Sequence, residues 1–325
     1  MTPAFSVSIN GANRTSVIAD RLLSLVIVDH DGGSADRLEI ELDDRDGRIE
    51  VPDDAAEVTV ALGFEGAALA PMGVFFVDGV SGSGPDQKIR LTATAADMKG
   101  AIRSAKTRPW FNKTLVEIVE TIASEAGLTA VVGESVSSIT WDYLAQTAES
   151  DLHFLDRITR PLDATAKPAG GALLVQRRGE GKNAAGEGLA PAQVSRSILT
   201  NWAWDFDDRK KVGAVAAKWS DTGSGSIETV EVGEGEPRKT LRTVYGSADA
   251  ATRAAEAAKR AATRASGTFK GQLAGFNPDL FAGRALALTG MRSELNGEWH
   301  LKTVTHRLGN SGLQTEFEAN ASSEI

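Results

Sequence analysis

The sequence predicts a mixed, mainly β fold with two antiparallel β-barrels and an intervening small α/β module. Short alternating strands fill the first third of the chain, a capped amphipathic helix comes next, and strands return from Trp202 onward. The predicted domains are a first barrel over residues 1–103, an α/β module with an exposed loop over 104–195, and a second barrel with an inserted alanine-rich helix over 196–325.

The first region consists of short predicted strands separated by turns. Glycine and proline clusters such as 81–85 fill the gaps between the strands. The expected strands are 22–28, 38–42, 58–62, 74–80 and 89–95. Strands of this length and spacing are typical of an antiparallel barrel or sandwich.

The acidic stretch LEIELDDRDGRIEVPDD resembles a calcium-binding loop but fits that pattern poorly. Aligning the loop glycine on Gly47 places the first ligand position on Leu42 and the closing position on Asp53 instead of a glutamate. Apolar and acidic residues alternate over 38–43 as in a half-buried strand, turn residues follow at 44–47, and a second short strand is expected at 48–51. This pattern favours a β-hairpin over a metal site. The hairpin tip is also a candidate subunit contact.

The middle region changes to helical patterns. Thr114 and Glu117 form a capping box, apolar residues of one helical face follow it, and Gly127 is placed to end the helix. A second helix is expected to begin near Ser150, with a strand at 172–176 and an exposed polar loop at 179–188 after it. The apolar faces consist of Leu115, Ile118, Val119, Ile122 and Ala126 in the first helix, and Leu152, Leu155, Ile158 and Leu162 in the second.

The last region returns to strands, interrupted by one alanine-rich helix over 247–267. Ser247 caps this helix and Gly267 closes it. We interpret its basic residues as a solvated face, because no aromatic side chains interleave with them as they do in nucleic-acid-binding surfaces. The expected strands are 212–219, 226–232, 283–288, 298–306 and 313–319.

Two stretches about 220 residues apart resemble each other. VTVALGFEGAALAPMGVFFVDGV begins at Val58, and RALALTGMRSELNGEWHLKTV begins at Arg284. Both predict the order strand, loop, strand, turn, strand, which favours an internal duplication into two similar barrels over a chance match of strand patterns. The matched pairs are Gly73 with Gly297, Phe75 with Trp299, Val77 with Leu301, Val80 with Val304, and Leu91-Thr-Ala93 with Phe317-Glu-Ala319.

The composition of the chain excludes several classes of function. The chain of 325 residues contains no cysteine, so disulfides, thiolate metal sites and cysteine nucleophiles are absent. It shows neither the apolar run of roughly 18–20 residues that a membrane helix needs nor the pattern of a signal peptide. Residues 1–103 carry a net charge of −8 out of −9 in total, which disfavours binding to nucleic acid. We therefore expect neither sequence-specific nucleic-acid binding nor membrane insertion.

No catalytic, cofactor-binding or metal-binding residues are predicted. Nucleophile-elbow, zinc-protease and phosphate-loop motifs are absent from the sequence. His300 and His306 are expected on one strand face, separated by roughly 20 Å, which is too far to share a zinc ion. His153 is interpreted as a partly buried structural residue. Trp202 and Trp204 share a strand face, and core packing is favoured over sugar stacking.

Several short motifs together resemble one protein family over nearly the whole chain. Each is weak alone, but their order and spacing are similar to the late control protein D family of phages with contractile tails, and to the hub portion of the VgrG proteins of type VI secretion. The motifs are RLLSL at 21–25, DRDG at 44–47, GVFFVD at 73–78, AADM at 95–98, ESDL at 149–152 with FL at 154–155, GEWH at 297–300 and VTH at 304–306.

The resemblance implies a structural baseplate hub and not an enzyme. It implies two tube-like barrels in each chain, a homotrimer, and a position between the hexameric tail tube and a trimeric spike. The partners expected are the tail tube protein, a separate spike protein and other baseplate proteins, without cofactors. The location implied is the virion tail baseplate, after assembly in the host cytoplasm. Three chains with two similar barrels would present six similar edges to a six-fold ring.

Two alternatives remain open at this level. A tail-associated cell-wall or polysaccharide hydrolase would need a convergent carboxylate pair about 5–9 Å apart. A monomeric carbohydrate-binding β-protein would expose Trp202 or Trp204 on the floor of a groove. For the hub, we expect some of the acidic side chains of the first region to face the lumen, where their charge would repel DNA during injection.

Overall fold

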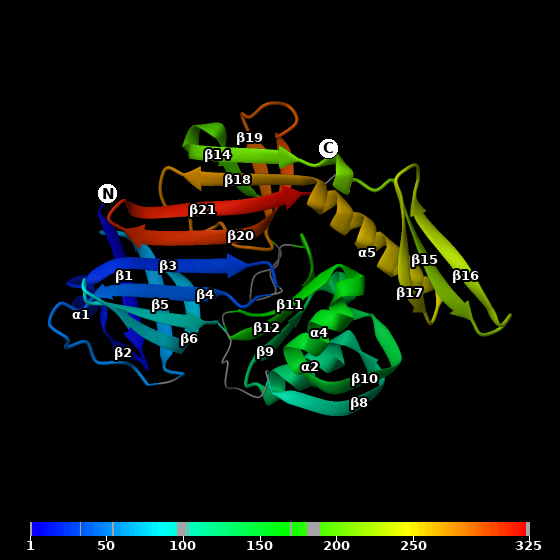
Figure 1. The fold of residues 1–325 in the computed structure, drawn as a ribbon, viewed down its shortest axis with the longest axis horizontal. Helices are drawn as coiled ribbons and strands as arrows, with labels where there is room; N and C mark the ends of the chain where they lie inside the picture. Colours follow the sequence, from blue (N-terminus) through cyan, green and yellow to red (C-terminus); the bar gives the residue numbers. More distant parts are fainter. Residues whose placement is uncertain are drawn as a thin grey trace.

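The computed structural model describes residues 2–32, 34–53, 55–95, 102, 104–169, 171–180 and 189–322. The fold is mainly β, as predicted, and most strand pairs are antiparallel. One 13-stranded sheet runs through both ends of the chain, and three small sheets accompany it (Figure 1). The motif residues 96–98 and most of the predicted loop, 181–188, lie outside the described residues.

The first region forms seven strands and one short helix. All five predicted strands are present, and the sequence reading missed only the first two. In β1, Phe5, Val7 and Ile9 alternate toward the core, and Val7 is fully buried. The elements are β1 (Pro3–Ile9), β2 (Ala12–Asn13), α1 (Thr15–Ala19), β3 (Leu22–His30), β4 (Arg37–Asp43), β5 (Glu57–Phe64), β6 (Ala70–Ser83) and β7 (Lys88–Thr94).

The predicted hairpin at residues 44–47 is half wrong. The turn exists, because the Gly47 amide donates to the Asp44 carbonyl at 2.8 Å and Gly47 has a φ of 64°. Residues 48–51, however, form no strand. Both edges of β4 are already paired, with β3 on one side and β7 on the other, so a returning strand has no free edge to join.

The middle region forms the expected helices between two small sheets. Thr114 accepts from the Glu117 amide, and Glu117 accepts from the Thr114 amide, so the capping box is confirmed. Gly127 follows the helix with a φ of 68°. The elements are β8 (Ala105–Thr114), α2 (Leu115–Glu125), β9 (Thr129–Val132), α3 (Glu134–Ser137), β10 (Thr140–Ser150), α4 (Asp151–Thr159), η2 (Arg160–Leu162), β11 (Ala164–Ala169) and β12 (Ala172–Arg177).

The last region contributes to two different sheets. Strands β15, β16 and β17 form a separate sheet that packs against α5 around Val215, Ala217, Ala251 and Ala255, whereas the other strands join the long sheet. The elements are β13 (Ala192–Ser195), η3 (Arg196–Ile198), β14 (Leu199–Phe206), η4 (Asp208–Lys210), β15 (Ala214–Asp221), β16 (Ser226–Gly233), β17 (Arg238–Tyr245), α5 (Ala248–Ser266), β18 (Gly267–Leu273), β19 (Ala285–Thr289), β20 (Gly297–Gly309) and β21 (Gly312–Ala321).

The alanine-rich helix α5 begins and ends where the sequence predicts. The Ser247 hydroxyl accepts from the Ala250 amide, and the helix ends at Gly267. Its basic residues are not all solvated, which corrects the prediction. Arg260 and Arg264 both bind the buried carboxylate of Asp163, at the end of η2, so that the helix is tied to the middle region.

The internal repeat extends beyond the residues that reveal it in the sequence. The first repeat pairs its strands in the order β3-β4-β7-β6-β5-β1, and the second in the order β14-β18-β21-β20-β19-β13. In each repeat, the chain visits the strands of this order in the same sequence order. The last pair differs in direction, because β1 is antiparallel to β5 whereas β13 is parallel to β19. Among the described residues, neither order of hydrogen-bonded strands returns to its first strand.

Backbone irregularities recur at equivalent positions of the two repeats. A bulge between Val77 and Gly79 of β6 matches one between Leu301 and Thr303 of β20. A bulge at Leu22 in β3 likewise matches one at Leu199 in β14. Because a bulge changes the register of everything after it, two matching bulges make a chance likeness of strand patterns a poor explanation.

The two repeats join through one strand pair. Residues 303–308 of β20 extend past β19 and pair antiparallel with residues 25–30 of β3. Leu308 and Leu313 of the second repeat thereby enter the core of the first. The two repeats consequently share one continuous sheet, with β20 and β3 adjacent at its centre (Figure 1).

No helix among the residues that the structure describes combines the length and apolar character that crossing a membrane requires.

The matched glycines Gly73 and Gly297 have nearly the same unusual backbone, with φ of 121° and 124°. We expect Gly297→Ala to lower the free energy of unfolding by about 1–3 kcal/mol, because an L side chain is strained at that φ. Chemical denaturation measures the effect. Gly246→Ala is the control, since a Cβ there meets nothing within 4 Å and φ is not positive. Equal stabilities of the two variants would contradict the role given to this backbone.

Candidate functional site

The long sheet presents one polar face that runs across both repeats. Cross-strand partners lie on the same side of a sheet, so the register places these residues together. Thr305, for example, lies between Val28 of β3 and Glu316 of β21. We call this surface the polar sheet face and define it by Glu39, Glu41, Arg90, Lys270, Thr303, Thr305, Arg307, Glu316 and Glu318.

Charges on the polar sheet face neutralise one another. Arg90 lies 3.3 Å from Glu39 and 3.7 Å from Glu41, and Lys270 lies 3.4 Å from Glu318. These pairs are solvent-exposed and each contributes little to stability. Among the residues that define the polar sheet face, three basic side chains stand against four acidic ones, so the charges on this surface nearly balance.

A buried ionic cluster holds the two repeats and the middle region together. Lys167 of β11 donates to Asp29 at 2.7 Å and to the His30 carbonyl at 2.9 Å, both in β3. Asp29 also accepts from the Ala282 amide of the second repeat at 2.8 Å. One lysine and one aspartate therefore connect three parts of the chain that are distant in sequence.

A second half of this cluster centres on Asp31, which follows β3. Its carboxylate lies 2.6 Å from Nε2 of His300 in β20 and 2.5 Å from the guanidinium of Arg178, which follows β12. Burial opposes ionisation of Asp31, but the hydrogen bond to His300 and the charges of His300 and Arg178 outweigh it and lower its pKa. The carboxylate stays ionised and bridges both repeats to the middle region.

The lysine half of the cluster contains one carboxylate more than Lys167 balances. Burial disfavours the Lys167 ammonium, yet the charges of Asp29 and Asp36 raise its pKa. Asp36, 3.6 Å from Lys167, has its pKa raised to about 7, first by burial and then by the charge of Asp29. The proton that this group holds keeps two neighbouring negative charges from facing each other near neutral pH.

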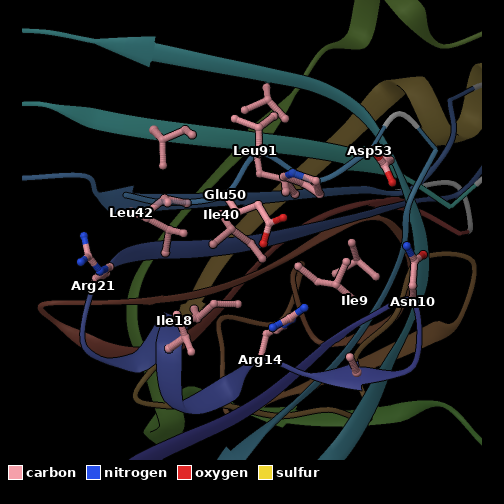
Figure 2. A pocket seen from close by; sticks show the side chains of 18 of the residues that line it. Ile9, Asn10, Arg14, Ile18, Arg21, Ile40, Leu42, Glu50, Asp53 and Leu91 are labelled. Atoms are coloured by element: carbon pink, nitrogen blue, oxygen red, sulfur yellow. The ribbon is translucent and has the colours of Figure 1, made fainter. Parts of the chain in front are cut away.

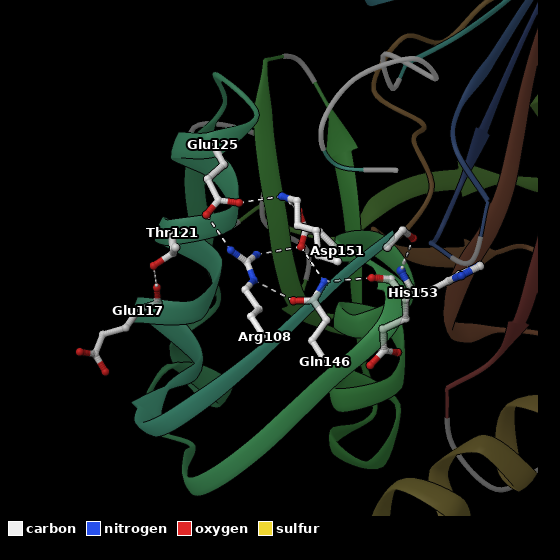
Figure 3. Close-up of polar contacts among 10 residues, drawn as sticks. Arg108, Glu117, Thr121, Glu125, Gln146, Asp151 and His153 are labelled. Carbon is white, nitrogen blue, oxygen red and sulfur yellow. Dashed lines mark hydrogen bonds and ion pairs between the residues drawn. The ribbon is translucent and has the colours of Figure 1, made fainter. Parts of the chain in front are cut away.

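A polar network stiffens the middle region (Figure 3). Arg108 of β8 donates to Gln146 of β10 at 2.9 Å, to Asp151 of α4 at 2.8 Å and to Glu125 of α2 at 2.6 Å. Asp151 is fully buried and also accepts from Lys106 and Gln146, so its charge is compensated. The network fixes both helices to the β8–β10 pair.

The outer surface of the β8–β10 pair carries two exposed aromatic side chains. Phe111 and Tyr143 are partners across the strands, with ring centroids 5.3 Å apart, and expose 61% and 57% of their surface. Neither residue stood out in the sequence, because β8 and β10 were not predicted as strands. Exposed aromatic pairs of this kind are typical of protein interfaces.

A cavity of about 490 Å³ lies in the first repeat, beside α1 (Figure 2). Its floor is apolar, with Ile9, Ile40 and Leu91, and the polar side chains at its rim include Arg14 and Glu50. The segment 48–51, predicted as a returning strand, lines the cavity instead, together with Pro52 and Asp53. Among the described residues, no group of three or more His, Asp or Glu side chains is placed to hold a metal ion.

The histidines do not lie as predicted. The bulge between Leu301 and Thr303 shifts the alternation of β20, so that His300 and His306 point to opposite faces, with His300 on Asp31 and His306 on Thr315 at 3.0 Å. Burial lowers the pKa of His306 to about 4. His153 is exposed, which corrects its expected partial burial, because the buried face of α4 consists of Phe154, Leu155 and Ile158.

The two tryptophans share a strand face as predicted, but neither is a core residue. Trp202 is half-buried, and Trp204 exposes 41% of its surface. Arg196 lies 3.7 Å from the ring centroid of Trp202, and Arg292 lies 5.2 Å from that of Trp204. Packing is incomplete because β14 is the last strand of the sheet.

Comparisons with known proteins agree on one family. The family model described as phage tail baseplate hub (GPD) matches residues 77–312. The chain belongs to this family. The probable baseplate hub protein of Escherichia phage 186 is 30% identical over 360 residues, which span 98% of this chain and 92% of that protein. As a member of the family, the protein is a structural component of the phage tail baseplate and not an enzyme.

Solved structures with little sequence identity share the fold. The 43 kDa tail protein of prophage MuSo2 from Shewanella oneidensis is 12% identical with a TM-score of 0.75, over 98% of each chain. A chain of the Francisella PdpA–VgrG complex is 8% identical to this chain, with a TM-score of 0.57. The match covers 100% of this chain and 59% of that chain. The expected likeness to the late control protein D family and to VgrG-related proteins is confirmed.

The sequence reading missed the ionic cluster, although single residues gave a signal. Asp29 ends the apolar run LVIV, and Lys167 interrupts the buried segment ATAKPA. A charged residue in a buried strand requires a partner. Nothing in the sequence shows that these two residues, 138 positions apart, are that pair.

We expect Asp36→Asn to change how stability depends on pH. The native state holds the Asp36 proton up to a pKa of about 7, whereas the unfolded chain releases it near 3.8. The stability that this group contributes is therefore present below about pH 4 and lost as the pH rises through 7. The wild-type protein should lose free energy of unfolding relative to the variant between pH 5 and pH 8, as measured by urea denaturation.

The control for this experiment is Asp46→Asn. Asp46 is paired with Arg21 at the surface, and its pKa is lowered to about 2, so it is ionised throughout the window in both states. A constant difference between wild type and Asp36→Asn from pH 5 to pH 8 would show that Asp36 is ionised in the folded protein.

Proposed function

We propose that the hub protein forms a homotrimeric ring that joins the hexameric tail tube to a separate trimeric spike. Each chain contributes two tube-like barrels, residues 1–103 and 196–325, on either side of the α/β module at 104–195. The observation that carries this proposal is the repeat of strand order and bulge positions. Three chains with two equivalent units offer six similar edges, and this resolves the mismatch between three-fold and six-fold partners.

The polar sheet face is the surface best suited to line the channel of such a ring. Several of its acidic and basic side chains are paired, as Arg90 is with Glu39 and Lys270 is with Glu318, so a passing DNA strand would meet a nearly neutral surface. We therefore propose a lumen whose acidic and basic side chains nearly balance, in place of the acidic lumen that the sequence led us to expect. A nearly neutral surface supports a role in passing DNA, because DNA would neither adhere to it nor be repelled strongly. The polar sheet face also offers no sequence-specific contact, because reading bases requires side chains that enter a groove of the DNA.

The remaining surfaces suit contacts with other tail proteins. The middle region and the β15–β17 sheet with α5 project away from the long sheet (Figure 1). They expose Phe111, Tyr143, Ile227 and Val244. We assign these surfaces to further baseplate partners, in a particle assembled in the host cytoplasm.

An open cavity of about 450 Å³ on the polar sheet face is lined by Trp202, Glu316 and Glu318, which is the arrangement that the carbohydrate-binding and hydrolase alternatives require. Burial raises the pKa of Glu318, but its hydrogen bonds and ion pairs with Lys302 and Lys270 outweigh burial and lower that pKa. Glu318 therefore lacks the raised pKa of a general acid, and we keep the hub as the proposal.

The mass in solution tests the assembly. Light scattering measures the mass of the purified full chain, alone and mixed with the spike protein encoded beside it. We expect a particle that contains three copies of this chain, each of 34.2 kDa. A strict monomer in both conditions would contradict the ring. Turnover of purified peptidoglycan by the same preparation would instead favour the hydrolase.

A further inference from the structure

The core of the first repeat is incomplete at the end beside α1. The cavity of about 490 Å³ opens there, between α1 and the segment 48–53 (Figure 2). Val80 and Ile89 line the cavity and are only half-buried. At the mouth, Val17 and Val51 expose 61% and 57% of their surface. Exposed apolar side chains gathered around an opening are typical of a site that binds another molecule.

The second repeat shows the same end of the core in a covered form. The matching bulges of β6 and β20 set the correspondence, so Val80 corresponds to Val304 and Ile89 to Thr315. Val304 and Thr315 are fully buried, whereas Val80 and Ile89 are half-buried. The two repeats therefore differ in what covers these equivalent positions.

The cover in the second repeat is the segment 274–284, which connects β18 with β19. The Thr315 amide donates to the Gly275 carbonyl at 3.0 Å, and the Thr315 hydroxyl accepts from the Asn277 amide at 3.0 Å. These bonds hold the segment against β21, and Leu280 is thereby fully buried in the core of the second repeat. One leucine side chain from a connecting segment thus completes this end of the core.

The corresponding segment of the first repeat lies between β4 and β5 and leaves its end of the core open. Residues 48–53 of this segment form a wall of the cavity, and each of them is exposed or half-buried. Apolar surface in contact with water is unfavourable, so an aliphatic side chain entering the cavity would be stabilised by burial. The place that Leu280 takes in the second repeat is available in the first.

Charges at the mouth add a second requirement. Figure 2 shows Arg14 and Glu50 on opposite sides of the opening. Neither side chain forms a hydrogen bond or ion pair with another residue that the structure describes. In the segment that covers the second repeat, Asp279 directly precedes Leu280, and Arg284 follows four positions later. A segment of the same pattern would bring one acidic and one basic side chain to Arg14 and Glu50.

We propose that the cavity beside α1 is a docking site for a short peptide segment of another tail protein. This segment inserts one aliphatic side chain, with an acidic residue before it and a basic residue after it. In a copy of this chain, the segment 274–284 is already packed into its own repeat, so a different protein supplies the occupant. The inference does not depend on the trimer proposed above.

A synthetic peptide tests the assigned chemistry. The probe has the sequence FNPDLFAGR of residues 276–284 and is titrated into the full-length protein, with methyl NMR signals of isoleucine, leucine and valine as the readout. We expect saturable shifts of the Ile40 and Leu91 methyl signals, which report on the cavity floor. The control peptide carries Leu280→Asp and should cause no such shifts. Shifts that are absent with the first peptide, or equal with both, would overturn the docking site.

A charge reversal at the mouth tests the second requirement with the same peptide. Arg14→Glu should raise the dissociation constant of the peptide at least about threefold, because an ion pair is replaced by repulsion. Arg242→Glu on β17 is the matched control, since it is exposed, lies outside the cavity lining and changes the net charge equally. Equal affinities of the two variants would contradict the proposed contact at Arg14.

Thiol labelling tests whether a partner covers the mouth in the assembled tail. Val51→Cys provides a single thiol, because the chain contains no cysteine. We expect a maleimide dye to react at least about tenfold more slowly in purified tails than in the isolated protein, since a bound segment excludes solvent from the site. Equal rates would overturn the inference. Protection that already arises when the isolated protein oligomerises would identify a second copy as the occupant and would likewise overturn it. Light scattering tests the trimer separately.

Discussion

The antiparallel pair of β20 with β3 is the constraint on which the rest of the architecture depends. It turns two repeats into one continuous sheet, and it lets Leu308 and Leu313 complete the core of the first repeat. Because a shift by one residue would exchange the two faces of the sheet, the register of this pair also decides which side chains form the polar sheet face. The buried cluster around Lys167 and Asp31 lies at the same junction and fixes the middle region to it.

Repetition gives the chain two similar units that share one sheet. Within one chain, the two similar units already form one junction, in which β20 of the second repeat pairs with β3 of the first. The repeats differ where their environments differ. Leu308 and His306 fill the internal junction, whereas Gly82 of β6 and Gly84, just after β6, stand at the equivalent positions of the first repeat. Trp204, which exposes 41% of its surface, lies on β14, and among the described residues this strand pairs with β18 only.

Much of this could be predicted from residue patterns, for identifiable reasons. The capping box at Thr114 and the ends of α5 at Ser247 and Gly267 are local signals that short-range hydrogen bonds enforce. The match of Gly73 with Gly297 identified the repeat, because only glycine tolerates their backbone at this φ. By contrast, the return strand at 48–51 was a reasonable local inference that failed, because both edges of β4 were occupied by strands distant in sequence.

The sequence by itself determined the mainly β class, the positions of most strands and helices, the repeat and the family, since alternation, capping and glycine placement act over a few residues. Only the tertiary structure decided which strands pair, and therefore where the bulges direct His300 and His306, which charges Lys167 and Asp31 meet, and which edges remain open. The physical reason is that a strand pattern specifies an inner and an outer face but not a neighbour. The neighbour is chosen by the packing and hydrogen bonding of the whole sheet.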